Sequence, residues 1–420
     1  MSAKDREERA EKLRERLNNE LKRVSLDHCV KCTLCEQSCP VAPVTELFSG
    51  PKFVGPQAER FRDGASVDHS VDYCSSCGTC TTVCPQGVQV AEINSLARAV
   101  MKAEQGVPLR DRLIVNTTLM GKVMTPVAPI ANAVLGNKLA RSLVEGIIGI
   151  GKSAPMPTAR SQSLHGWLKS RQKPTKAATR GPVVFFHGCA GGYFEVDAAK
   201  KAIEVLEHIG FEVLVPKQGC CGLAAQSNGL FEQASEGVLK LARQLNSAGK
   251  DLTIVSTAGS CAGMLKHEAH EILGLDDPSL LSVGTRTRDI SEFLMELYEA
   301  DELPTDFRPV ELRVPYHQPC QVRSQGIGMP AADLLRLIPG IEVVESGVAC
   351  CGIAGTYGLK KEKYDIAQAV GKPLFDMVEQ TNQGLVACDT ETCRWQIEKS
   401  TGVAAVHPIV LMHKAYGLGD

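Results

Sequence analysis

Residues 29–40 read CVKCTLCEQSCP, and residues 74–85 read CSSCGTCTTVCP. Each run has three cysteines separated by two residues, a fourth cysteine after three more residues, and then a proline. Thiolates are soft ligands that suit iron–sulfur clusters, and where two such runs occur together the fourth cysteine of each run binds the other cluster. The spacing therefore predicts two [4Fe–4S] clusters with crossed ligand sets, one made of Cys29, Cys32, Cys35 and Cys84, the other of Cys39, Cys74, Cys77 and Cys80.

A pair of zinc sites is the alternative interpretation of these runs. Zinc ribbons use pairs of C-x2-C rather than three cysteines followed by a proline-terminated fourth, so the spacing favours iron. The 34 residues between Cys39 and Cys74 exceed what a compact bacterial ferredoxin needs, and a helical pattern over residues 90–104 follows the second run. We therefore predict an α-helical ferredoxin-like domain over residues 25–106, of the type found in respiratory iron–sulfur subunits.

The C-terminal half contains an internal repeat. Three landmarks recur at offsets of 130 to 132 positions: Cys189 with Cys320, Cys220-Cys221-Gly222 with Cys350-Cys351-Gly352, and Cys261 with Cys393. Apolar, β-rich stretches alternate there with amphipathic helical patterns, as in parallel sheets with crossover helices. The sequence thus predicts two tandem α/β modules, over residues 182–305 and 306–420. We call them the first and second CCG modules, after the Cys-Cys-Gly triplet.

The cysteines of each module follow predicted strands. Because the carboxyl ends of parallel strands lie along one edge of a sheet, thiolates that are distant in sequence should converge there. Gly222 and Gly352 would let the backbone turn tightly beside them. The expected metal ligands are Cys189, Cys220, Cys221 and Cys261 in the first module, and Cys320, Cys350, Cys351, Cys388 and Cys393 in the second.

The two modules differ at one position, because Ser256 stands where the second module has Cys388. Five thiolates allow a cubane or a less regular [4Fe–4S]-type cluster in the second module, whereas four suit an ordinary cube or a zinc ion in the first. We therefore expect one or two further iron–sulfur clusters. Vicinal disulfides are the alternative, and an intracellular setting disfavours them. His187 and His317 are expected to donate hydrogen bonds to the ligands rather than to bind metal.

Composition limits the remaining possibilities. The 420-residue chain is 44% hydrophobic and 22% charged, with a net charge of −2, so no global basic field for nucleic acid is implied. Residues 1–23 are charged throughout and resemble no secretory signal, so the 17 cysteines are not expected to form a disulfide framework. No run of 18 or more apolar residues occurs, so we predict no transmembrane helix.

Two further segments complete the predicted organisation. Residues 1–24 form a charged helix with an apolar stripe, which either docks a partner or, as is commoner for such helices, rests on the next domain. Residues 107–181 form a connector with apolar patches over 113–151, and residues 159–181 carry six Lys or Arg, no acidic residue and Trp167. This connector either contacts an anionic membrane surface or simply packs between domains.

The fold class is thus α+β and multidomain, with a helical ferredoxin-like domain before two tandem α/β CCG modules with parallel sheets. At its cysteines the chain resembles heterodisulfide reductases and the iron–sulfur subunits of glycolate and lactate oxidases. It is most similar to the family of C subunits of anaerobic glycerol-3-phosphate dehydrogenases, over nearly the whole chain from about residue 27. That resemblance rests on the strings GPK at 50–52, GP at 55–56, ER at 59–60, LMG at 119–121, TPVAPI at 125–130, CCGIAGTYG at 350–358 and ETCRWQIE at 391–398.

The resemblance implies a peripheral subunit on the cytoplasmic face of the cell membrane. It would accept electrons from flavin-containing A and B subunits that oxidise glycerol 3-phosphate, and pass them to menaquinone. The sequence shows no GxGxxG fingerprint at a strand-to-helix turn, so we expect no substrate oxidation by this chain alone. Its chemistry would be a one-electron relay.

Other functions remain open from the sequence. The chain could serve a glycolate or lactate oxidase, or act as a heterodisulfide-reductase-like thiol–disulfide reductase. The four-ligand first module counts against the reductase. A redox sensor is a further alternative, although a sensor would not need four candidate sites in series.

Overall fold

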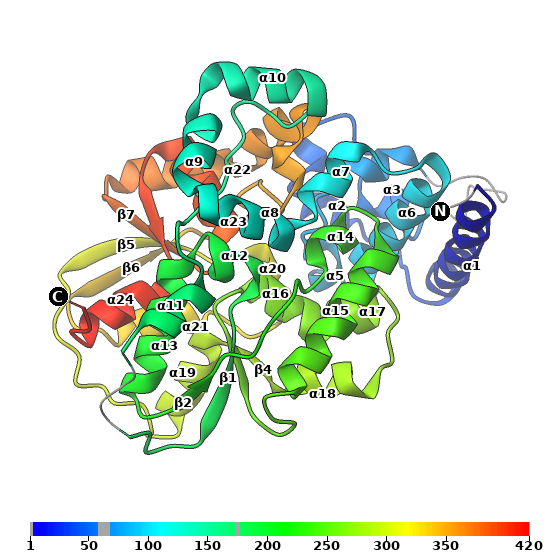
Figure 1. Cartoon of the computed structure of the whole chain (residues 1–420). Coiled ribbons are helices and arrows are strands. Elements are labelled where there is room, and N and C mark those ends of the chain that lie inside the picture. The colour runs from blue at the N-terminus through cyan, green and yellow to red at the C-terminus, as the bar shows by residue number, and fades with distance from the viewer. Residues whose placement is uncertain (1–2, 58–67, 173–176, 420) are drawn as a thin grey trace.

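A computed structural model describes residues 3–57, 68–172 and 177–419 of this chain. The helical N-terminal region lies on one side of the molecule, and the two sheets of the C-terminal half lie below and opposite it (Figure 1). Helices α9 and α10 form the top of this view. The architecture is the mixed α/β arrangement predicted from the sequence, with helices first and two parallel sheets after them.

The ferredoxin-like region is helical. Among its described residues within 25–106 no strand is present, and a predicted helix over residues 90–104 is confirmed as α6. The elements are α2 (Leu34–Gln37), the 3-10 helix η1 (Ala42–Val44), α3 (Pro51–Val54), the 3-10 helix η2 (His69–Tyr73), α5 (Thr79–Thr82) and α6 (Val90–Gln105).

The long N-terminal helix α1 (Ala3–Asp27) packs along α6. Its apolar stripe buries Ala10 and Leu17, and Arg14 pairs with Glu104 on α6. Arg9 reaches Glu232 of the first CCG module at 2.9 Å. These contacts are those expected of a helix that rests on the adjoining domains.

The two CCG modules have the same sheet topology. The first sheet has the order β2-β1-β3-β4 and the second the order β6-β5-β7-β8, and every pairing is parallel. The duplication predicted from the cysteine spacing is therefore present in the strand order as well. The strands are β1 (Pro182–Phe186), β2 (Glu212–Leu214), β3 (Ile254–Ser256), β4 (Thr287–Asp289), β5 (Leu312–His317), β6 (Ile341–Glu345), β7 (Leu385–Cys388) and β8 (Ala404–Val406).

Helices cover both sheets. In the first module these are α12 (Gly188–Tyr193), α13 (Val196–His208), α14 (Leu223–Ser227), α15 (Phe231–Asn246), α16 (Gly259–Gly263), the π-helix η4 (Met264–Glu268), α17 (Ala269–Glu271), α18 (Pro278–Arg286) and α19 (Ile290–Glu299). In the second they are α20 (Cys320–Arg323), α21 (Pro330–Arg336), the 3-10 helices η5 (Tyr357–Leu359) and η6 (Lys361–Lys363), α22 (Tyr364–Thr381), α23 (Glu391–Thr401) and α24 (Pro408–Ala415).

The hydrophobic core joins these parts into one body. One core cluster combines Val88 and Met101 of the ferredoxin-like region with Phe186 and Leu241 of the first module. A second cluster combines side chains of both modules, among them Phe185 on β1, Tyr316 on β5 and Met412 on α24. The cysteine loops are consequently carried by elements that are packed against one another.

The connector folds into helices α7 (Leu109–Ile114), α8 (Thr117–Met124), η3 (Thr125–Val127), α9 (Ala128–Gly136), α10 (Lys138–Ile148) and α11 (Leu164–Ser170). We call α7 to α10 the helical cap. Residues Thr117–Gly136 form one helical run that is long and apolar enough to cross a membrane by length and composition alone, which is weak evidence for a span. Pro126 and Pro129 do not interrupt this run, because each proline occupies a first turn, where its missing N–H costs no hydrogen bond.

The basic segment after the cap differs from the expectation of a free membrane-binding stretch. Arg171 pairs with Glu207 at 2.6 Å, and its guanidinium lies 4.7 Å from the centre of the Trp167 ring. Trp167 itself is partly buried against the core of the modules. Lys173 and Lys176 lie outside the described residues. The charge of Arg171 and the ring of Trp167 therefore make contacts within the protein.

Glycines at the two Cys-Cys-Gly triplets have left-handed backbones, as the sequence predicted: φ is +87° at Gly222 and +86° at Gly352. A Cβ on Gly222 would lie 2.6 Å from the carbonyl oxygen of Ala234, and one on Gly352 closer still to that of Ala367. We expect Gly352→Ala to lower the free energy of unfolding by about 2–5 kcal/mol, the sum of backbone strain and overpacking.

The matched control is Gly402→Ala. Gly402 also has a positive φ, +72°, but no atom lies within 4 Å of its added Cβ, so only the backbone strain of about 1–2 kcal/mol applies. Chemical denaturation of the two purified variants measures both losses. Equal losses would contradict the steric explanation.

Candidate iron–sulfur centres

The two ferredoxin-type runs have the same backbone. Lys31 and Thr33 in the first run have positive φ, and so do Ser76 and Gly78 at the matching positions of the second. Non-glycine residues rarely adopt this conformation, and clusters of such residues are typical of functional sites. The left-handed turns let the loop wind so that its three cysteines point to a common centre.

The first predicted ligand set lies around one cavity. Cys29, Cys32, Cys35 and Cys84 all line it, together with Val88 and Lys52. The Val88 N–H lies 3.4 Å from the Cys84 sulfur, and burial raises the pKa of Cys35 to about 11.

The second predicted set is also brought together. Burial raises the pKa of Cys39 to about 12, although its sulfur accepts an N–H hydrogen bond from Ala42 at 3.4 Å, and the charges of Cys77 and Cys74 contribute. The pKa of Cys80 is raised by burial and by Cys77, Cys74 and Cys39. The fourth cysteine of each run therefore stands beside the three early cysteines of the other run. The crossed ligand assignment itself stays a prediction.

In the first CCG module the four sulfurs form one group. Cys221 and Cys261 approach to 3.1 Å, and Cys189 is hydrogen-bonded to Cys220. The hydroxyl of Thr117, from the helical cap, donates to the Cys189 sulfur at 3.0 Å.

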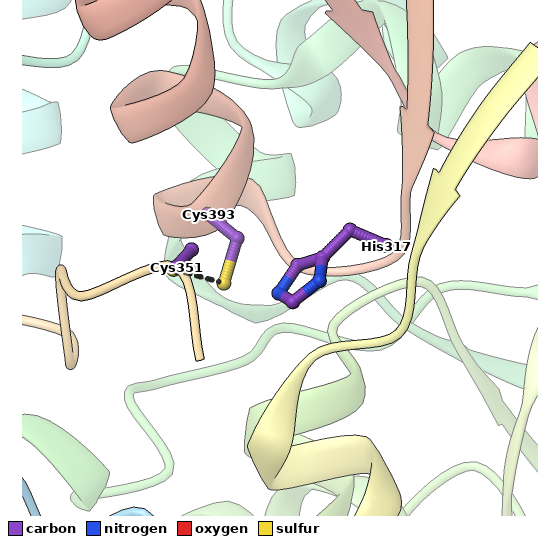
Figure 2. A group of neighbouring side chains, drawn as sticks. All are labelled: His317, Cys351 and Cys393. Atoms are coloured by element: carbon purple, nitrogen blue, oxygen red, sulfur yellow. Dashed lines mark hydrogen bonds between the residues drawn. The ribbon is translucent and has the colours of Figure 1, made fainter. Parts of the chain in front are cut away.

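In the second CCG module five sulfurs are grouped. Cys351 and Cys393 lie 3.0 Å apart, Cys320 is hydrogen-bonded to Cys350, and Cys388 to Cys393. Figure 2 shows the Cys393 sulfur beside the ring of His317. One ligand atom each from His317, Cys351 and Cys393 lie within 4.8 Å of one another, as in a metal site.

The position at which the modules differ is the last residue of a strand in each sheet. Ser256 is the last residue of β3 and pairs with Phe186, whereas Cys388 is the last residue of β7 and pairs with His317. The Ser256 hydroxyl donates to the Phe186 carbonyl at 2.9 Å and accepts from the Ala258 N–H at 3.0 Å. Ser256 is thus fully used in backbone hydrogen bonds, and the first module presents four thiols.

The two histidines occupy matching places. Burial lowers the pKa of His187 and of His317 to about 4, so both rings are neutral at pH 7. Nδ1 of His317 lies 3.1 Å from the Ser346 hydroxyl, and Nδ1 of His187 is close to the Gly188 carbonyl oxygen. The Nε2 atoms of both are buried without a hydrogen-bond partner among the described residues. A neutral ring has one N–H to donate. That each histidine donates a hydrogen bond to a cysteine ligand stays a prediction.

These groups of sulfur atoms fit iron–sulfur clusters. None of the 17 cysteines, all of which lie in the described residues, forms a disulfide. Several deprotonated thiols within one such group would repel one another in a buried site, and bound cationic iron removes that repulsion. Backbone N–H groups of Gly222 and Gly352 point at the sulfurs of Cys220 and Cys350, at 3.4 and 3.3 Å, and so favour thiolates.

The four sets of cysteines lie in a row. Cys77 of the second ferredoxin set interacts electrostatically with Cys350 and Cys320 of the second CCG module. The side-chain amide of Gln321 holds this junction by donating to the Ser76 carbonyl at 3.0 Å. The cysteine sets of the two CCG modules in turn line a common cavity. The order is therefore first ferredoxin set, second ferredoxin set, second module, first module.

A buried ion network fixes the ferredoxin-like region to the second module. Asp72 pairs with Lys363 at 2.7 Å and with Lys102 at 2.9 Å. Burial alone would raise the pKa of Asp72, but the two ammonium groups hold it well below its usual range. Because removing one partner of such a network leaves a buried charge uncompensated, the network favours one relative placement of the two parts.

Two residues that contact the cysteine loops were not expected from the sequence. Arg98 of α6 donates to the carbonyl oxygens of Val71 and Cys74 and so shapes the second cysteine loop, and Thr117 contacts two thiols of the first module. Both lie far in sequence from the cysteines they touch. No local signal marked Arg98, whereas Thr117 stands just before the string LMG at 119–121.

Comparison with known proteins agrees with this geometry. The 4Fe-4S dicluster domain family matches residues 25–88, and the cysteine-rich domain family matches residues 183–266 and 314–398. The C subunit of the anaerobic glycerol-3-phosphate dehydrogenase of Escherichia coli (strain K12) is 36% identical over 93% of this chain and 98% of its own length.

More distant relatives share the same span. The B subunit of the fumarate reductase (CoM/CoB) of Methanothermobacter marburgensis is 28% identical over 89% of this chain and 67% of its own length. The D subunit of the dihydromethanophenazine:CoB–CoM heterodisulfide reductase of Methanosarcina barkeri is 24% identical over 88% of each chain. The chain therefore has iron–sulfur domains and oxidoreductase relatives throughout its length.

The crossed ligand sets generate a prediction. Cys84→Ser should damage the cluster held by Cys29, Cys32 and Cys35, whereas Cys39→Ser should damage the cluster held by the second run. Electron paramagnetic resonance spectra of the reduced proteins would show a different signal lost in each variant. Loss of the same signal in both would refute the crossed sets.

Proposed function

This chain belongs to the family of C subunits of anaerobic glycerol-3-phosphate dehydrogenase, and on that basis we propose that it is the iron–sulfur electron-transfer subunit of such an enzyme. The row of four cysteine sets is the observation that supports this role most strongly. When bound, the clusters supply one-electron transfer at potentials set by ligands, charge and burial. The two ferredoxin sets would hold [4Fe–4S] clusters, the second module a [4Fe–4S]-type cluster, and the first module a cluster with fewer ligands or zinc.

The electron donors in this proposal are the flavin-containing A and B subunits. Electrons would enter the row at the first ferredoxin set, where Cys32 is exposed. Large apolar side chains are exposed in the same region, at Val30, Leu34, Leu47 and Phe53. Exposed apolar groups beside an exposed ligand are typical of a protein–protein interface, so this is the surface on which we place the partner subunits.

The helical cap supports attachment to a membrane. It exposes ten large apolar side chains: Leu109, Leu113, Leu119, Val123, Val127, Ile130, Val134, Leu139, Leu143 and Ile147. The exposed charged residues within 109–152 are all basic: Arg112, Lys122, Lys138 and Lys152. Apolar helices with basic flanks lie in the interface of an anionic membrane. We propose peripheral attachment to the cytoplasmic face of the cell membrane through the cap, with menaquinone as the electron acceptor.

The alternative functions differ in the partner and its substrate. A glycolate or lactate oxidase would use the same relay, and a heterodisulfide-reductase-like enzyme would use the CCG modules to cleave a disulfide. The name of the Methanosarcina barkeri relative, a heterodisulfide reductase subunit, favours the latter for that protein. The high similarity to the C subunit of the Escherichia coli enzyme, along nearly the whole of both chains, favours the dehydrogenase here.

We predict that glycerol 3-phosphate reduces this chain only through its partners. When the chain is co-purified with the A and B subunits, adding glycerol 3-phosphate under anaerobic conditions should bleach the iron–sulfur absorbance, because electrons enter from the flavin. The chain alone should not be bleached. Bleaching by lactate or glycolate with their flavoproteins, but not by glycerol 3-phosphate, would assign the chain to the alternative oxidases.

The cap generates a second prediction. Leu139, Leu143 and Ile147 share one exposed face of α10, and changing all three to Ser should weaken binding to anionic liposomes at least tenfold, since each apolar side chain contributes about 1.5–3 kcal/mol when buried. Sedimentation with liposomes measures this. Leu281→Ser, at an exposed leucine outside the cap, is the control. Unchanged binding of the triple variant, with the iron content intact, would show that the cap is not the membrane contact.

A further inference from the structure

A cavity of ≈ 190 Å³ lies between the two CCG modules. Thiols of both modules form part of its wall, including Cys189 and Cys261 from the first and Cys351 and Cys393 from the second. The wall extends beyond the thiols to Met156, Trp395 and Gln226 and to residues of α8. Clusters bound at the two cysteine sets would fill the thiol-lined part of the cavity, so a further molecule would lie in the remaining part, beside those clusters and at the far end of the row from the exposed Cys32.

The wall selects against charged ligands. Its side chains are mainly apolar, and among the described residues that line it there is no Lys, Arg or His. Apart from thiols, Glu391 is the one ionisable group in that lining. A phosphate or carboxylate ligand would lose its hydration without gaining a charged partner, which is costly. A neutral, largely apolar electron acceptor fits instead.

Among the described residues that line the cavity, one buried side-chain donor has no hydrogen-bond partner. Gln226 is 2% exposed, and its side-chain Nε2 has no hydrogen-bond partner among the described residues. An unsatisfied buried donor costs about 1–3 kcal/mol, so a buried amide of this kind indicates a missing acceptor. Gln226 lies on α14, which follows directly on Cys220, Cys221 and Gly222, so its donor is held beside the first module's thiols.

Helix α8 connects the cavity with the exposed apolar surface. Thr117 and Met120 line the cavity, while Leu119 and Val123 on the same helix are each 60% exposed. In Figure 1, α8 lies beside α12 and below the cap helices α9 and α10. The helix that forms part of the cavity wall thus also presents apolar side chains on the surface that the cap would place in the membrane.

We propose that this cavity is the binding site of a para-quinone, and that Gln226 Nε2 donates a hydrogen bond to one quinone carbonyl. The proposal rests on the electron-transfer function proposed above. In the reaction the quinone takes up two electrons, delivered one at a time through the relay from the partner flavin, and two protons from water. The quinone becomes the quinol while the flavin donor is oxidised by two electrons.

The test is binding of menadione, a tail-less para-naphthoquinone, to the oxidised protein with its clusters intact, measured by equilibrium dialysis. Wild-type protein should bind menadione, and Gln226→Met, which keeps the side-chain length but removes the donor, should bind about tenfold more weakly. The control is Gln368→Met. Its Nε2 is also buried without a partner in the described part of the chain, but Gln368 does not line the cavity, so binding should be unchanged.

A second variant tests the same cavity in case Gln226→Met disturbs folding. Ala224→Phe, also in the wall, should fill part of the cavity and abolish menadione binding while the iron content stays at the wild-type value. Wild-type binding by either variant, or no binding by the wild-type protein, would overturn the proposed site.

The test of the quinone site by menadione binding is independent of the test of electron transfer from the partner subunits. Bleaching of the clusters by glycerol 3-phosphate in the complex, measured anaerobically with no electron acceptor present, does not require the cavity. If bleaching is normal and menadione does not bind, the quinone site is wrong and the relay stands. If menadione binds and bleaching fails, the donor assignment is wrong instead.

Discussion

Sulfur atoms from separate loops lie about 3 Å apart in both CCG modules: 3.1 Å between Cys221 and Cys261, and 3.0 Å between Cys351 and Cys393. Thiolates at such distances repel one another in a buried site, so the thiols stay largely protonated until a metal is bound, and the chain must hold the sulfurs close together for the metal to bind them. Parallel sheets do this by ending neighbouring strands at one edge. Left-handed glycines at 222 and 352 then turn the backbone where a side chain would collide with the facing helix.

The same requirement explains why the parts of the chain are so firmly joined. A relay is useful only if the distance between its sites is fixed, and this protein fixes it with a shared core and with buried polar contacts. Asp72, Lys102 and Lys363 join the ferredoxin-like region to the second module, and Lys360 with Asp111, 2.9 Å apart, joins that module to the cap. Buried pairs of this kind contribute little net stability but make alternative placements of the parts expensive.

The two CCG modules are copies of one unit, and they differ in the number of cysteines that each presents. One module keeps a fifth cysteine at the end of its third strand, while the other has a serine that bonds to the backbone. The cavity between them combines walls from both copies with a helix that belongs to neither. The cap therefore has two faces: one completes the cavity and the other remains apolar and basic on the surface.

The sequence by itself determined the local and the repeated features. The cysteine spacing identified the runs, and the offsets of 130 to 132 residues identified the duplicated module, because each copy folds into the same strand order. Helix α6 was predictable from its periodicity. Only the tertiary structure decided which parts meet: that Cys77 stands beside Cys350, that Arg171 is paired with Glu207, and that Gln226 is left without a partner in the wall of the cavity. These contacts depend on how whole elements pack, and no spacing along the chain encodes the distance between the surfaces of separate elements.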